Sequence, residues 1–308
     1  MTSAVSTSGR IEKLSSASLR KVIDPDLDLP GTVGDGQLLP DELLFTVDLG
    51  LDLTADQRRT LAREQLASIT EAGLRFEAVL MAGFSLEIAT APDLTDARIV
   101  YALHEIGEET RHSRLFSRLL KDLAPTARNP LARPILRKVQ RIGMGRIASR
   151  PALLCVLVLA GEEIPDLLQK IACEHPDTDP FVREVNRYHR MEEARHLAYA
   201  RAVLSEQWAK ASRTERFAVR YIAPLVVRDM YNLLVHPGVY ETIGLPGWKT
   251  WREVKSAPSI VARRYEAIRP IVKILVDNGI FKPGRVPKPW REVAGVDSHG
   301  APLGATTG

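Results

Sequence analysis

Residues 108–112 read Glu-Glu-Thr-Arg-His, and residues 192–196 repeat the pattern as Glu-Glu-Ala-Arg-His. Each segment contains one Glu-x-x-His unit, and the chain contains no third. Residues three apart on a helix lie on the same face, about one turn apart. Each unit therefore directs one carboxylate and one imidazole toward a common point. Two such units facing each other, with one Glu from each of two further helices, make the di-metal site of a four-helix bundle.

The spacing along the chain suggests which residues supply the two remaining carboxylates. Glu77 lies 32 residues before Glu109, and Glu162 lies 31 residues before Glu193. An antiparallel helix pair joined by a short turn returns to the same depth after roughly that many residues. The chain therefore carries one helix pair twice, with the same chemistry in both copies.

Turns near residues 91–94 and 175–177 would place these glutamates level with the two Glu-x-x-His units. Two alternatives remain. Glu71 could replace Glu77, although it breaks the matched spacing, and Glu163 could replace Glu162. Glu163 lies roughly 100° further round the helix.

The two copies differ in one histidine. His189 precedes Glu193 by four residues, so it shares the ligand face and is a candidate additional ligand. The matching position before Glu109 is Glu105, a candidate acid behind the ligands. His104 comes five residues before Glu109 and points away on an ideal helix, so we interpret it as structural.

Burial explains why these acids need cations. Glu162 follows an unbroken apolar run from Ala152 to Ala160, ALLCVLVLA. A buried carboxylate without a partner costs several kcal/mol or is neutralised by a pKa shift. Four converging carboxylates are untenable alone, but their four negative charges balance two divalent irons.

Helix signals cover most of the chain and predict an all-α fold, a ferritin-like four-helix bundle core with additional N- and C-terminal helices. A capping box at Thr54 and Gln57 opens a helix that runs to about Thr90. The later helices are opened by Asp93 or Thr95, by Pro151, by Pro180 and by Ser212, and a further one covers about Ala257–Asn278.

The domain organisation follows from these helices. We expect an irregular N-terminal arm over residues 1–40, a single di-iron helical domain over 41–280, and an extended or disordered tail over 281–308. The connecting segment 126–150 should contain a short basic helix. Pro165 has no N–H for the carbonyl of Gly161, so a kink or π-bulge is expected beside Glu162.

Composition sets the broad class. The chain has 308 residues, 45% of them hydrophobic, which is enough for one large core. Cys155 and Cys173 are not spaced as a pair of metal ligands would be, and we interpret both as buried thiols in a reducing compartment. The first residues lack an apolar signal region and no run could span a bilayer, so we expect a cytoplasmic protein that binds no membrane. A net charge of +4 is mild, and nucleic-acid binding is not expected.

The combined pattern Glu…Glu-x-x-His…Glu…His-x-x-x-Glu-x-x-His, over roughly residues 55–235, resembles the non-haem di-iron arylamine N-oxygenases. The extra histidine, here His189, separates that family from ribonucleotide reductase small subunits and acyl desaturases. By this resemblance Glu108 and Glu192 hold ligating histidines, with Glu105 as a further supporting acid. The implied iron ligands are Glu77, Glu109, His112, Glu162, His189, Glu193 and His196.

The resemblance also implies an activity. Two iron ions would activate O2 as a peroxo-diferric species and oxygenate a primary arylamine to a hydroxylamine, nitroso or nitro product. Electrons would come from an external ferredoxin or reductase, because the chain has no flavin, haem or Fe–S motif. The alternatives are a di-iron hydroxylase or desaturase acting on carbon, and a ferritin-like iron or peroxide protein. A homodimer is expected, and Arg228, Tyr231 and Asn232 are candidate pocket residues.

Overall fold

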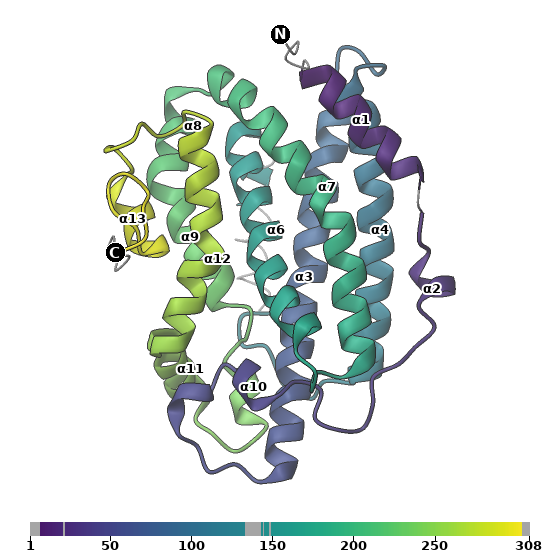
Figure 1. Ribbon diagram of the computed structural model, residues 1–308, viewed down its shortest axis with the longest axis vertical. Coiled ribbons are helices and arrows are strands. Elements are labelled where there is room, and N and C mark those ends of the chain that lie inside the picture. The colour runs from purple at the N-terminus through teal and green to yellow at the C-terminus, as the bar shows by residue number, and fades with distance from the viewer. Residues whose placement is uncertain (1–6, 21, 133–142, 144, 148, 304–308) are drawn as a thin grey trace.

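The structure, a computed structural model, describes residues 7–20, 22–132, 143, 145–147 and 149–303. Within these ranges the regular elements are helices, apart from one isolated bridge between Val296 and Pro302. The all-α prediction is therefore confirmed. Four long helices lie side by side as a bundle (Figure 1). They are α3 (Ala55–Thr90), α4 (Ala97–Leu123), α6 (Pro151–Glu174) and α7 (Pro180–Lys210).

The bundle consists of two antiparallel hairpins. Helix α3 packs mainly on α4, and α6 packs mainly on α7. Their turns, residues 91–96 and 175–179, lie where the spacing predicted them. The capping box at Thr54 and Gln57 is confirmed, and the Asp179 side chain accepts hydrogen bonds from two backbone N–H groups at the start of α7. The start of α4 was predicted wrongly: Asp96 caps it, because Asp93 accepts from Thr95 within the turn itself.

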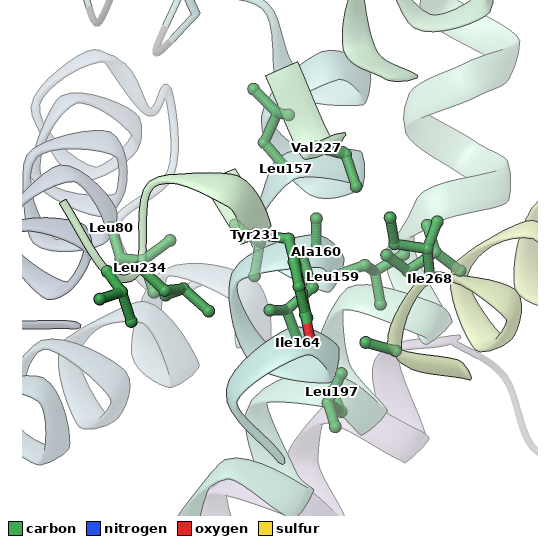
Figure 2. Close-up of a cluster of buried hydrophobic side chains, with 14 of the residues drawn as sticks. Leu80, Leu157, Leu159, Ala160, Ile164, Leu197, Val227, Tyr231, Leu234 and Ile268 are labelled. Atoms are coloured by element: carbon green, nitrogen blue, oxygen red, sulfur yellow. The ribbon is translucent and has the colours of Figure 1, made fainter. Parts of the chain in front are cut away.

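Additional helices enclose one long side of the bundle. Helices α9 and α12 pack against α6, whose apolar run is therefore covered on several faces. Figure 2 shows Ala160 and Ile164 of α6 between Leu80 of α3 and Ile268 of α12, and all four side chains are buried. The shorter elements are α2 (Pro25–Asp28), η1 (Asp41–Leu43), η2 (Val47–Leu49), α8 (Arg213–Phe217), η3 (Ala218–Ile222), α9 (Ala223–Asn232), α10 (Gly238–Glu241), α11 (Gly247–Ser256) and α12 (Pro258–Asp277).

The N-terminal arm, which the sequence predicted to be irregular, contains helical segments among its described residues. Residues Thr7–Arg20 form helix α1, which packs across α4 and α7 (Figure 1). Only Ile11 and Ser18 of this helix are buried, so its apolar pattern is too sparse to be read from the sequence. The segment that follows is fixed to α4 by Arg114, which pairs with Asp24 at 3.1 Å.

The C-terminal tail also differs from the prediction. Residues Lys288–Ala294 form helix α13, in which Trp290 is fully buried. The Trp290 indole N–H donates to the carbonyl of Val219 at 2.9 Å and so fixes the tail to the π-helical turn η3. The prolines that flank this helix occupy its cap and first turn, where a missing N–H is tolerated.

No π-bulge occurs beside Glu162, because α6 continues as α-helix through Pro165. The π-helical turn of the described chain lies instead in η3, which ends two residues before Pro224, and Pro224 has no N–H to give to Arg220. The basic helix expected within 126–150 falls largely outside the described residues. In the described part of the chain, no helix has the length and apolar character that crossing a bilayer requires.

Candidate metal centre

The structure brings all seven predicted ligand residues to one point inside the bundle. They form two groups of four, and within each group the candidate ligand atoms lie within 4.8 Å of one another. Every one of these side chains is buried. Glu193 belongs to both groups. The first group is Glu77, His112, His189 and Glu193, and the second is Glu109, Glu162, Glu193 and His196.

Two carboxylates lie between the two Glu-x-x-His histidines. The Glu193 oxygens approach the Nδ1 atoms of His112 and His196 at 3.1 and 2.8 Å. The Glu109 oxygens approach the same two nitrogens at 3.2 and 3.1 Å. Each carboxylate thus offers one oxygen to each half of the site, as a bridging ligand would.

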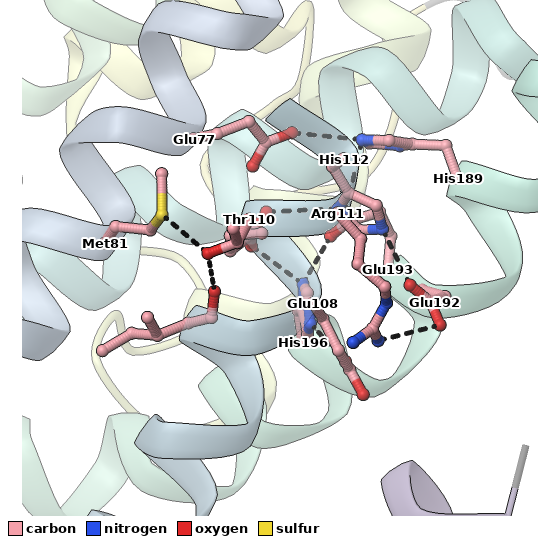
Figure 3. A network of polar contacts seen from close by, with 12 residues as sticks. Glu77, Met81, Glu108, Thr110, Arg111, His112, His189, Glu192, Glu193 and His196 are labelled. Carbon is pink, nitrogen blue, oxygen red and sulfur yellow. Dashed lines mark hydrogen bonds and ion pairs between the residues drawn. The ribbon is translucent and has the colours of Figure 1, made fainter. Parts of the chain in front are cut away.

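The outer nitrogens of these histidines are held by acids from the opposite hairpin. His112 Nε2 lies 3.1 Å from Glu192, and His196 Nε2 lies 2.8 Å from Glu108 (Figure 3). When Nε2–H donates to a carboxylate, the lone pair of the ring is left on Nδ1, which faces the centre. Such acids orient a ligating histidine and increase its basicity.

His189 faces the site through its other nitrogen. Its Nε2 lies 3.1 Å from Glu77, while its Nδ1 lies 3.2 Å from the side-chain oxygen of Gln169. The amide oxygen can only accept, so Nδ1 carries the proton and Nε2 keeps its lone pair. Burial lowers the pKa of His189 to about 4, and the imidazole is therefore neutral at pH 7.

Several supporting residues were missed from the sequence. Arg195 pairs with Glu108 at 2.9 Å, Arg111 approaches Glu192 at 3.5 Å, and the Tyr188 hydroxyl donates to Glu192 at 3.0 Å. The two arginines occupy the same place in both repeats, and that match was the available signal. Tyr188 precedes Glu192 by four residues, and Gln169 follows Glu162 by seven, so helix periodicity could have found both.

A close approach of two helices sets the distance between Glu77 and Glu162. The Phe76 ring of α3 lies directly over Gly161 of α6, where an added Cβ atom would be only 1.5 Å from the ring. Glycine is therefore required at this position. Because Phe76 and Gly161 each precede a candidate ligand, the contact brings the two carboxylates to the same depth.

The remaining candidates fall outside both groups. Glu71 pairs with Arg75, and Glu163 pairs with Arg201, so each alternative acid already has a cation. His104 is half-buried and belongs to neither group. Glu105 is fully buried beside the site, and burial raises its pKa well above the ordinary value.

The arrangement fits a pair of divalent cations. One oxygen each of Glu77 and Glu162 is buried and has no hydrogen-bond partner in the described residues. Burial, followed by repulsion from Glu109, raises the pKa of Glu77, and burial with repulsion from Glu193 raises that of Glu162. Imidazole and carboxylate ligands suit iron, and four such carboxylates balance two divalent ions.

Substitution of Glu77 or Glu162 should distinguish the acids that bind iron from the neighbouring acids that do not. We expect Glu77→Ala and Glu162→Ala each to lower the iron content toward one atom per chain, because each acid belongs to one group. Glu71→Ala and Glu163→Ala should retain both irons, since these acids lie in separate ion pairs. Elemental analysis of the reconstituted variants measures this. Equal losses in all four variants would contradict the assignment.

The iron-free protein should lose stability as the pH rises above about 6.5, the ordinary pKa of histidine. Neighbouring carboxylates raise the pKa of His112 and His196 despite burial, so the folded protein keeps protons that the unfolded chain releases. Stability of this kind is lost with rising pH, by at most about 1.4 kcal/mol per group and pH unit. The raised pKa values of Glu77 and Glu162 act in the same direction, and the lowered pKa of His189 acts only below pH 6.5.

Iron replaces those protons, so the loaded protein should show a much flatter profile. The measurement is the melting temperature between pH 6 and 9, with and without iron. Parallel profiles for the two forms would contradict this account of the site.

Comparison with known proteins agrees with this geometry. A protein-family model described as "P-aminobenzoate N-oxygenase AurF" matches residues 8–279. An uncharacterized protein of Mycobacterium bovis and its counterparts in two strains of Mycobacterium tuberculosis are each 29% identical to this chain over 192 residues. The match covers 61% of this chain and 54% of each relative, so the chain spans about half the length of the curated relatives it matches.

Proposed function

Because this chain belongs to the p-aminobenzoate N-oxygenase AurF family, we propose that it is a di-iron monooxygenase that oxygenates the nitrogen of a primary arylamine. The strongest support for the proposal is the presence of two buried clusters, each of four carboxylate and imidazole side chains, that have Glu193 in common. The products would be a hydroxylamine and, after further turnovers, a nitroso or nitro compound. Removal of single ligands should be damaging because the metal pair carries the oxidising equivalents.

The roles of the chain's own residues follow from the site. Glu77, His112 and His189 would hold one iron, and Glu162 and His196 the other, with Glu109 and Glu193 between them. The irons, when bound, supply the activation of O2 and the oxidising power. Glu109, His112 and His196 are fully buried, so the helices around them exclude bulk water from the reacting centre.

His189 distinguishes this site from a six-ligand di-iron site. Its Nε2 would give the metal a neutral donor, and Gln169 holds the ring through Nδ1. We propose that this donor favours oxygen transfer to nitrogen over attack on C–H bonds. The alternative, a hydroxylase or desaturase acting on carbon, lacks a comparable observation in this chain.

A labelling experiment tests the proposed activity. The reduced, iron-loaded protein is given 18-oxygen gas and a panel of arylamines, and the products are analysed by mass spectrometry. We expect one or more labelled oxygen atoms on nitrogen. Label found consistently on carbon would move the assignment to a carbon oxygenase, and iron loading of many atoms per chain would indicate a storage protein.

Two partners complete the proposal. Electrons would come from an external ferredoxin or reductase, and the small-molecule amine is the substrate. We also propose a homodimer, supported by large apolar side chains exposed along α8, η3 and α9. They are Phe217, Tyr221, Ile222 and Leu225, which are between 42% and 57% exposed.

A further inference from the structure

A cavity of about 420 Å³ lies between α3, α6 and α7. This volume falls within the range of roughly 300–1,000 Å³ that is typical of small-molecule sites. Val158 and Tyr199 line the cavity, and each lies about one helical turn from a candidate iron ligand, Glu162 and His196. The cavity therefore adjoins the metal centre. The earlier pocket candidates lie elsewhere: Tyr231, for example, is buried in the core against Phe45 (Figure 2).

Two aromatic rings, Phe84 and Tyr199, line the cavity. The Tyr199 ring stacks on Tyr101 with 4.4 Å between centroids, and Phe84 lies 6.3 Å from Tyr199. Burial, followed by the charges of Glu87 and Glu105, raises the pKa of Tyr199. Tyr199 of the cavity lining thus interacts electrostatically with Glu105, the acid beside the ligands.

One acid lies in the lining of the cavity. Most lining residues are apolar, and Glu87 is the one carboxylate among those that the structure describes. None of the lining residues that the structure describes is Lys, Arg or His. Arg98 lowers the pKa of Glu87, but its guanidinium is engaged by Glu206 at 3.2 Å and Asp96 at 3.5 Å. Burial dominates, and the pKa of Glu87 is raised.

The position of Glu87 suits the far end of a bound molecule. Glu77 and Glu87 lie ten residues apart on α3, which corresponds to about 15 Å along the helix axis. A molecule with its amine at the metal centre and its other end at Glu87 must therefore be elongated. A carboxylate at that end would lie beside a second carboxyl group in a partly buried, largely apolar setting, where the two acids either repel each other or must take up a proton.

We propose that this cavity takes an elongated, mainly apolar primary amine whose far end is neutral or cationic and donates a hydrogen bond to Glu87. p-Aminobenzoate, the compound in the family's name, carries a carboxylate, and this lining disfavours such a group. The assignment of the amine to the metal end rests on the proposed function. The charge preference at the far end concerns binding alone and needs no turnover.

Three matched probes test the preference. They are 4-(4-aminophenyl)butanoate, the corresponding butanamide and the corresponding butylamine, which share the aminophenyl group and the chain length and end in an anionic, a neutral and a cationic group. Calorimetric titration of the oxidised, iron-loaded protein without reductant gives dissociation constants in the absence of chemistry. We expect the butylamine to bind at least about ten-fold more tightly than the butanoate, a ratio that corresponds to about 1.4 kcal/mol.

Substitutions at the acid should change that ratio. In Glu87→Gln the butylamine and butanoate should bind within about three-fold of each other, and in Glu87→Lys the butanoate should bind more tightly. Glu71→Gln is the matched control, because it removes an acid from the same helix outside the cavity, and it should retain the wild-type ratio. The butanamide should bind similarly to wild type, Glu71→Gln and Glu87→Gln, which all keep an acceptor oxygen on these side chains, and more weakly to Glu87→Lys, which has none.

The proposal is overturned if the butanoate binds wild-type protein as tightly as the butylamine, if no probe binds, or if the Glu87 variants keep the wild-type ratio. The charge preference with no oxygenation of any amine would contradict the proposed function and leave the binding site standing. Oxygenation of an amine without any dependence of binding on Glu87 would support the proposed function and contradict the proposed binding site.

Discussion

Replacement of Glu193 by alanine is expected to leave the purified protein with almost no iron. Glu193 belongs to both ligand groups, and its two oxygens approach His112 and His196 at 3.1 and 2.8 Å. Its loss therefore removes a ligand from both metal positions and one of the four negative charges that balance the two divalent ions. Glu77→Ala removes a ligand from one position only and should retain about one iron per chain.

Iron content, measured by elemental analysis after anaerobic reconstitution, decides this. Glu193→Gln keeps the size of the side chain, and circular dichroism of both variants shows whether the helices survive. Folded Glu193→Ala protein that binds two irons would disprove the shared role of this carboxylate.

Replacement of His189 by alanine should abolish most of the oxygenase activity while the protein stays folded. Loss of even a residue that supports a metal ligand lowers metal affinity or activity by about 10–100-fold. We expect at least that for His189, whose Nε2 faces Glu77. His104→Ala should be nearly neutral, since this side chain is half-buried and lies outside the site.

Added imidazole should partly restore the activity of His189→Ala, because the substitution leaves a space beside Gln169 and the Phe116 ring, which stacks on His189 at 4.9 Å. The readouts are product formation and the optical spectrum of the iron-loaded protein. Equal losses in His189→Ala and His104→Ala, or no spectral change in His189→Ala, would contradict a ligand role.

The bundle and the seven converging residues could be predicted because both depend on local periodicity. A capping box, a first-turn proline and a Glu-x-x-His unit each involve residues within one turn of a helix. The matched spacing then related the two hairpins. The roles of these residues as iron ligands remain a prediction that the substitutions above test.

The failures involve contacts that no local pattern records. Helix α1 buries only Ile11 and Ser18, and α13 is stabilised by a distant hydrogen bond from Trp290 to Val219. Because proline lacks an N–H, a π-turn was predicted beside Pro165, but the structure has its π-turn before Pro224. No sequence pattern marks Glu87 as a pocket residue, because an acid in a pocket is recognised only by the residues that surround it in the folded protein.

The crossed acids at the metal centre link two otherwise separate halves of the chain. Glu108 of the first hairpin holds His196 of the second, and Glu192 of the second holds His112 of the first. The acid that holds the Nε2 atom of each histidine comes from the other hairpin. A half-chain would therefore have ligands of the right kind in the wrong orientation. Tight iron binding therefore reports that the hairpins have met in the correct register. An ancestor built from one hairpin would have needed a second copy to acquire the metal.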